Sequence, residues 1–220
     1  MRTPIFKELK AHAPFTLLGS CTGVALLLAI LATRMELARL EPAFESTHAL
    51  HILVSAVVTA AMYRRYRKGL LAAVVIGYCG SVGIATISDI FFPHHGGRII
   101  LKIIGEHKPM HFHLPAVEEW WLINPVALLG TAIGIWWHTT KIPHSIHILL
   151  STWASLFYLV VNAPAGINWL PVLPLVLVVL FVAVWVPCCF SDIAFPLLFV
   201  GKGGAVHEHV HAHDKHPQGG

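Results

Sequence analysis

The sequence predicts an all-α polytopic membrane protein with six transmembrane helices arranged as a 3+3 inverted-topology repeat. Three observations support this prediction: the composition, the alternation of long apolar stretches with short charged clusters, and an internal duplication. Of the 220 residues, 56% are hydrophobic and only 12% are charged, whereas a soluble domain typically has about 25% charged residues. The mean hydropathy is +0.70. This composition is typical of a chain that crosses lipid several times.

Three short patterns each occur twice, once in each half of the chain and in the same order. They are P-x-x-L-L-G-x-x-x-G at 14–23 and 125–134, H-x-x-H-I-L-x-S at 48–55 and 144–151, and S-D-I-x-F-P at 88–93 and 191–196. One matched apolar segment could arise by chance in a membrane protein. Three matches in register indicate an internal duplication.

The apolar stretches predict the spans, of which the longer ones have roughly the 20 residues needed to cross the hydrocarbon layer. The predicted spans are about 15–33, 48–63, 69–92, 121–138, 145–163 and 169–190. Because each half contains an odd number of spans, the second half enters the bilayer from the opposite side. The duplication is therefore predicted to be an inverted repeat, which is a recurrent plan of secondary transporters.

The repeat divides the chain into four segments. Residues 1–92 and 121–200 are the two three-helix repeats, and residues 93–120 are a His-rich extracytoplasmic linker with a short interfacial helix. Residues 201–220 are predicted to be a disordered, His-rich cytoplasmic tail that could buffer or sense metal. The loops that would face one side hold most of the Lys and Arg residues, which predicts that both termini are cytoplasmic. We expect the protein in the inner (plasma) membrane of a prokaryote.

Each half begins with a G-x-x-x-G pair, Gly19 with Gly23 and Gly130 with Gly134. Small residues at this spacing allow helices to approach closely within a membrane. We interpret all four glycines as packing residues.

The polar residues that the duplication preserves are of metal-ligand type. Two histidines three residues apart lie on one face of a helix, about one turn apart, and each pair is accompanied by an aspartate. The predicted metal ligands are His48, His51 and Asp89 in the first half and His144, His147 and Asp192 in the second. Imidazole with carboxylate suits Zn, Fe, Ni or Co better than calcium, which prefers oxygen ligands.

Whether these six residues form one site or two stays open at this point. His48 precedes Arg64 by sixteen residues, or about 24 Å of helix, so a span starting at His48 places that residue near the outer edge of the bilayer. An inverted repeat then places the second triad near the inner edge. The two triads would meet only if the helices are short, tilted or broken.

Other polar residues have two interpretations each. His94 and His95 follow Asp89 closely and could complete the outer site or lie at its mouth, and the linker around them is either a metal-capturing vestibule or a polar loop. Two serine positions recur in both halves, as Ser55 with Ser151 and Ser88 with Ser191. These serines are either donors that orient the ligands or simple packing residues.

These residues predict a membrane transporter for a divalent transition-metal ion. The alternative is an integral membrane metalloenzyme with a catalytic zinc or di-iron site, for which residues 1–200 lack an H-E-x-x-H motif. Proton relay and structural hydrogen bonding are further interpretations of the buried polar groups. The expected partners are the lipid bilayer and the metal ion, with no role for nucleic acid, and a homo-oligomer is compatible with the sequence.

Overall fold

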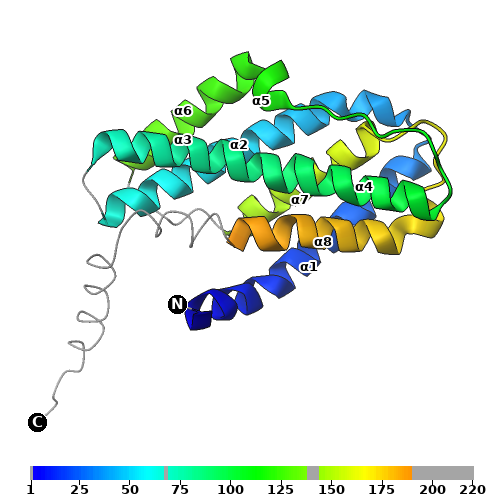
Figure 1. Ribbon diagram of the computed structural model, residues 1–220, viewed down its shortest axis with the longest axis horizontal. Helices are drawn as coiled ribbons and strands as arrows, with labels where there is room; N and C mark the ends of the chain where they lie inside the picture. Colours follow the sequence, from blue (N-terminus) through cyan, green and yellow to red (C-terminus); the bar gives the residue numbers. More distant parts are fainter. Residues whose placement is uncertain (1, 67–68, 138–143, 190–220) are drawn as a thin grey trace, which may run out of the picture.

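The computed structural model describes residues 2–66, 69–137 and 144–189. These residues form helices joined by loops, and no strand occurs among them (Figure 1). The elements are α1 (Arg2–Ala32), the 3-10 helix η1 (Leu37–Leu40), α2 (Glu41–Tyr66), α3 (Leu70–Thr86), the π-helix η2 (Ile87–Phe91), α4 (Phe92–Ile103), α5 (Pro115–Glu118), α6 (Trp120–Trp136), α7 (His144–Val161), the 3-10 helix η3 (Leu170–Val172) and α8 (Leu173–Cys189). The predicted all-helical architecture is confirmed for this part of the chain.

Four helical stretches are long and apolar enough to cross a membrane, which is compatible with a membrane-embedded protein. They are Ala13–Ala32, Leu37–Arg65, Leu70–Ile103 and Leu170–Pro187, and two shorter apolar helices occupy Trp120–Trp136 and Ile146–Val161. The second stretch starts well before the predicted residue 48. Glu41 and Glu45 lie within its helix, because a helix can continue beyond the apolar part of its sequence and a carboxylate is favourable near its N-terminus.

The third stretch also extends beyond its predicted end at residue 92. Proline normally ends a helix because it lacks an N–H, but here α3, η2 and α4 form one continuous rod that passes through Pro93 (Figure 1). The wide π turn at Ile87–Phe91 ends two residues before this proline and shifts the hydrogen-bond register there. π turns inside α-helices are rare and frequently occur at functional sites.

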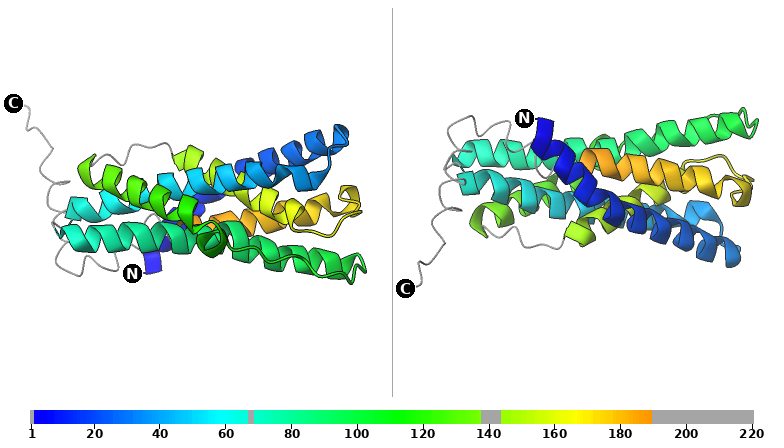
Figure 2. Two further views of the ribbon diagram at one scale, coloured as in Figure 1. Left: turned by 90° about the horizontal axis from the view of Figure 1, so that it is seen from above. Right: turned by 90° about the horizontal axis from the view of Figure 1, so that it is seen from below.

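Helix α2 lies at the centre of the bundle, where it packs against α3, α6 and α7, while α1 packs against α7 and α8 (Figures 1 and 2). Close contact between α2 and α6 depends on two of the predicted packing glycines. A Cβ atom at Gly130 would lie 2.5 Å from the carbonyl oxygen of Leu53, and one at Gly134 would lie 2.3 Å from that of Val57. The predicted packing role of these glycines is therefore confirmed.

The two halves of the chain contain comparable sets of helices, but their relation by an inverted repeat stays a prediction. The last repeated pattern, at residues 191–196, lies outside the described residues, as does the His-rich tail at 201–220. The second-half helices α6 and α7 are also shorter than the continuous rods of the first half.

Candidate functional site

Four of the predicted site residues meet in the middle of the bundle and form a cluster that we call the His/Asp centre (His48, His51, Asp89 and His147). His48 and His51 lie one turn apart on α2, Asp89 lies in the π turn η2, and His147 lies in the first turn of α7. Each of these side chains is at most 2% exposed. His51 stands midway along the Leu37–Arg65 stretch, so the centre lies deep between the ends of the helices.

Asp89 is held by four donors. The Nδ1 atoms of His48 and His51 lie 2.9 Å and 2.7 Å from its Oδ2 atom. The hydroxyl groups of Ser88 and Ser151 donate to Oδ1 over 2.7 Å and 2.8 Å. A carboxylate offers about four lone-pair positions to donors, so the side chain is saturated as an ionised acceptor. Ser88 and Ser151 thus serve as donors to the carboxylate.

The hydrogen bonds to Asp89 fix the orientation of two imidazole rings. Because Nδ1 of His51 donates to the carboxylate, its Nε2 atom carries a lone pair when the ring is neutral. The Nε2 atom of His147 lies 2.7 Å from this atom and donates to it, and the two ring centroids are 4.7 Å apart. The contact joins a residue of the first half of the chain to one of the second.

The ring of His48 has the same orientation but a different neighbour. Its Nε2 atom is buried and has no hydrogen-bond partner among the described residues. The ring of Phe44 stacks on it with centroids 5.4 Å apart. His48 therefore presents an unused nitrogen lone pair inside the bundle, and an unpaired buried polar atom is costly unless a ligand satisfies it.

The electrostatic balance of the centre favours a cation. With neutral imidazoles the His/Asp centre carries one negative charge, and the hydrogen bonds to Asp89 come from histidine and serine side chains. Within the described residues, no group of three or more His, Cys, Asp and Glu side chains is arranged to hold a metal ion directly. As arranged, the chain of hydrogen bonds can hold or pass a proton, and binding a metal ion would require the His51–His147 hydrogen bond to open.

The remaining predicted ligands are not part of the described His/Asp centre. His94 and His95 lie on α4 and line a separate cavity. His144 is the first residue of α7, but its side chain is outside the described part of the molecule, and Asp192 lies wholly outside it.

A second polar cluster lies next to Phe44, in the linker that the sequence predicts to be either a metal-capturing vestibule or a polar loop. His113 in the linker bonds to two carboxylates, with Nδ1 3.0 Å from Glu118 Oε2 and Nε2 3.0 Å from Glu119 Oε1. The backbone N–H of Leu114 donates to Glu118 over 2.7 Å, which lowers the pKa of that carboxyl group. The ring of Phe44 contacts His113 edge-on with ring centroids 6.1 Å apart, so this ring contacts both the cluster and His48.

Comparisons of the chain with protein-family models, curated proteins and solved structures returned no match. The case for a function therefore rests on the geometry of the His/Asp centre and on what surrounds it.

Proposed function

We propose that this protein is a membrane transporter that carries a divalent transition-metal ion across the bilayer through the His/Asp centre. One observation carries the proposal. The buried carboxylate of Asp89 orients the imidazoles of His48 and His51. The Nε2 atom of His51 then faces a third imidazole, that of His147, from the other half of the chain. Ionisable residues inside a membrane bundle are costly and typically mark ion or proton paths.

The orientation of the imidazoles supports a transition metal as cargo. A metal-binding histidine usually donates its second ring N–H to a carboxylate, which fixes the ring and makes its other nitrogen a better ligand. Asp89 has this relation to both His48 and His51. We assign the Nε2 atoms of His48, His51 and His147 as the ligands. Nitrogen ligands of this type favour Zn, Fe, Ni or Co over calcium and magnesium.

Metal binding would compete with a proton. Two nitrogen ligands at 2.0–2.1 Å from a tetrahedral ion lie about 3.3 Å apart, whereas the Nε2 atoms of His51 and His147 are 2.7 Å apart. The ion must therefore widen this gap and displace the Nε2 proton of His147. This proton can move to Nδ1 of the same ring, whereas protonation of an imidazole at both nitrogens excludes the ion, so transport is expected to weaken as the pH falls.

Burial favours a transporter over a metalloenzyme. A catalytic metal keeps an open coordination position that a substrate or water can reach, but all four side chains of the His/Asp centre are almost completely enclosed. An occluded site near the middle of a bundle suits a carrier, whose ligands lie where its repeats meet. We keep His144 and Asp192 as proposed ligands of an inner counterpart, and both termini as cytoplasmic in a prokaryotic inner membrane.

The cluster next to Phe44 supplies an entrance for the cargo. Glu118, Glu119 and His113 would attract a cation from the linker side, and the Oε2 atom of Glu119 is buried without a hydrogen-bond partner among the described residues. Phe44 is 1% exposed, and its ring contacts both His113 and His48. We assign its ring as the gate between entrance and centre.

Replacing His147 by glutamine is expected to lower metal uptake by roughly tenfold or more while the protein stays folded. The glutamine amide can still donate a hydrogen bond towards His51, but it is a poor ligand for a transition metal. Uptake of Zn²⁺, Fe²⁺, Ni²⁺ and Co²⁺, each supplied alone, is measured in proteoliposomes that enclose a metal-sensitive dye.

The matched control is Thr59→Val on α2, the helix that carries His48 and His51. Thr59 is fully buried, and its hydroxyl group has no hydrogen-bond partner among the described residues, so the isosteric change should leave both uptake and stability intact. Equal uptake by the native chain and the His147→Gln variant for all four metals would refute the proposed function.

Replacing Phe44 by alanine is expected to let protons leak through the bundle. The change removes the ring that contacts both His113 and His48 and leaves a buried cavity that costs about 3–5 kcal/mol of unfolding free energy. Phe44→Leu keeps an apolar plug and should leak much less. Proton leak is followed with an enclosed pH dye, and vesicles of the alanine variant that stay as tight as native ones would contradict the gate.

A further inference from the structure

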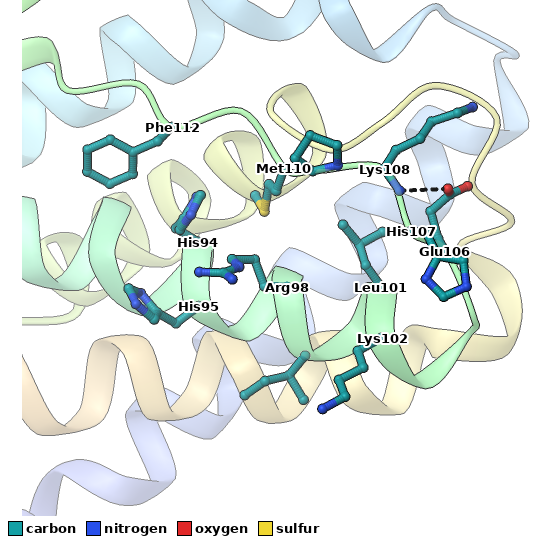
Figure 3. A pocket seen from close by; sticks show the side chains of 12 residues that line it. His94, His95, Arg98, Leu101, Lys102, Glu106, His107, Lys108, Met110 and Phe112 are labelled. Atoms are coloured by element: carbon teal, nitrogen blue, oxygen red, sulfur yellow. Dashed lines mark hydrogen bonds between the residues drawn. The ribbon is translucent and has the colours of Figure 1, made fainter.

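A cavity of about 650 Å³ lies between α4 and the linker that follows it (Figure 3). It is distinct from the His/Asp centre and from the cluster next to Phe44. Helix α4 contributes His94, His95 and Arg98 to its lining, together with Ile99, Leu101 and Lys102, and the linker contributes Glu106, His107, Lys108, Pro109, Met110 and Phe112.

The lining of this cavity is electropositive. Arg98, Lys102 and Lys108 carry fixed positive charges, whereas Glu106 is the single carboxylate among the lining residues. This carboxylate already accepts a hydrogen bond from the backbone N–H of Lys108 over 3.0 Å, as Figure 3 shows. Two positive charges therefore remain uncompensated within the lining. Such a balance favours an anion here, rather than the metal ion that His94 and His95 suggested from the sequence.

The walls of the cavity are held by backbone contacts. The N–H of His111 donates to the carbonyl of Asn162 at the end of α7 over 2.9 Å, and the N–H of Glu106 donates to that of Leu101 over 2.9 Å. A Cβ atom at Gly97 would lie 2.5 Å from the Sδ atom of Met110, so the linker lies directly on α4. The cavity is thus built by the fold and does not depend on flexible side chains alone.

A buried histidine in the cavity lining, His94, has one ring nitrogen without a hydrogen-bond partner. His94 is 7% exposed, and its Nδ1 atom makes no hydrogen bond within the described part of the chain. Its ring is held edge-on against Phe112 with centroids 5.0 Å apart, and in Figure 3 it lies between Phe112 and Arg98. When the ring is protonated, Nδ1 can donate to an oxygen of a bound anion while the ring keeps its hydrogen bond to the backbone of His111.

We infer that this cavity binds a phosphate group, with Arg98, Lys102 and Lys108 neutralising its charge and His94 donating a hydrogen bond. The planar guanidinium of arginine matches two phosphate oxygens at once. Ile99 and Ile103, next to these cations on α4, are each 61% exposed. Apolar side chains facing outward beside clustered cations are the arrangement expected where a helix meets anionic lipid headgroups. The phosphate therefore belongs to an anionic phospholipid or to a soluble phosphate compound.

The test compares the full native chain with an Arg98→Gln/Lys102→Gln variant in two arms. In the lipid arm, native mass spectrometry measures retention of phosphatidylglycerol against phosphatidylcholine from nanodiscs that contain both. In the soluble arm, inorganic phosphate and glycerol 3-phosphate are titrated in detergent while the thermal midpoint is recorded. We expect the native chain to retain phosphatidylglycerol and the variant to bind it at least tenfold more weakly.

The matched control is Arg34→Gln/Arg39→Gln, which removes two cations near η1, at the same end of the bundle (Figure 1). Retention by this control should equal that of the native chain. If the double variant does not fold, Lys108→Gln on the linker replaces it. A response in the soluble arm alone identifies a soluble phosphate compound as ligand and supports the phosphate site. No preference for phosphatidylglycerol together with no response to phosphate, or equal losses in variant and control, overturns the inference.

Discussion

Replacing Asp89 by asparagine is expected to destabilise the protein by about 3 kcal/mol or more and to reduce metal uptake by roughly 100-fold. The carboxylate accepts hydrogen bonds from two imidazoles and two hydroxyl groups. An asparagine offers one oxygen and turns an NH₂ group towards donors, so buried N–H and O–H groups lose their acceptor. The negative charge that attracts the cargo also disappears. Unfolding free energy in detergent and uptake in proteoliposomes measure the two effects.

A double-mutant cycle shows whether these losses arise at the His/Asp centre. Ser151→Ala removes one donor to Asp89, so its cost should be clearly smaller in the Asp89→Asn background than in the native chain. Ser20→Ala is the matched control, since Ser20 is equally buried but donates only to the carbonyl of Thr16 in its own helix. Its cost should be the same in both backgrounds. Additive effects of Asp89→Asn and Ser151→Ala would argue against a connected network.

The composition of the His/Asp centre followed from the sequence to a large extent. The H-x-x-H spacing on an apolar helix and the repeated aspartate were enough to group His48, His51 and Asp89, because helical periodicity and chain direction constrain where they lie. The depth of this group was not predictable from hydropathy. The predicted span began at His48, but the helix reaches back to Leu37 and places His51 near its middle.

The contact between His51 and His147 and the gate at Phe44 depend on tertiary packing. The pattern at 144–151 does not indicate how far α7 extends towards the centre of the bundle. No local sequence signal predicts the π turn that directs Asp89 inward. His113, Glu118 and Glu119 were visible in the sequence as a polar linker, but their pairing comes from the fold of that linker over Phe44. Composition gives the residue types of such a cluster, whereas long-range packing gives its geometry.

Replacing Gly134 by alanine is expected to cost about 3 kcal/mol of unfolding free energy. The new Cβ atom would lie 2.3 Å from the carbonyl oxygen of Val57, which is main chain and cannot rotate away. Helices α6 and α2 would have to separate along the contact that holds α2 in place. Because α2 carries His48 and His51, uptake should fall together with stability. Thermal midpoints and SDS-induced unfolding of the purified protein measure the loss.

Other glycines of the bundle provide the controls, because their surroundings differ in a graded way. Gly83→Ala meets no atom within 4 Å, so the better helix propensity of alanine should leave stability unchanged or raise it by up to about 1 kcal/mol. Gly130→Ala approaches the carbonyl of Leu53 at 2.5 Å, and Gly19→Ala meets only the side chains of Thr152 and Ile148 at 3.1 Å and 3.3 Å. The expected order of destabilisation is Gly134, Gly130, Gly19, Gly83. Equal losses of unfolding free energy at all four positions would show that the close approach of α6 to α2 does not hold the bundle together. Alanine at Gly130 and Gly134, where Cβ meets the backbone, would then destabilise the protein no more than alanine at Gly83, where Cβ meets no atom.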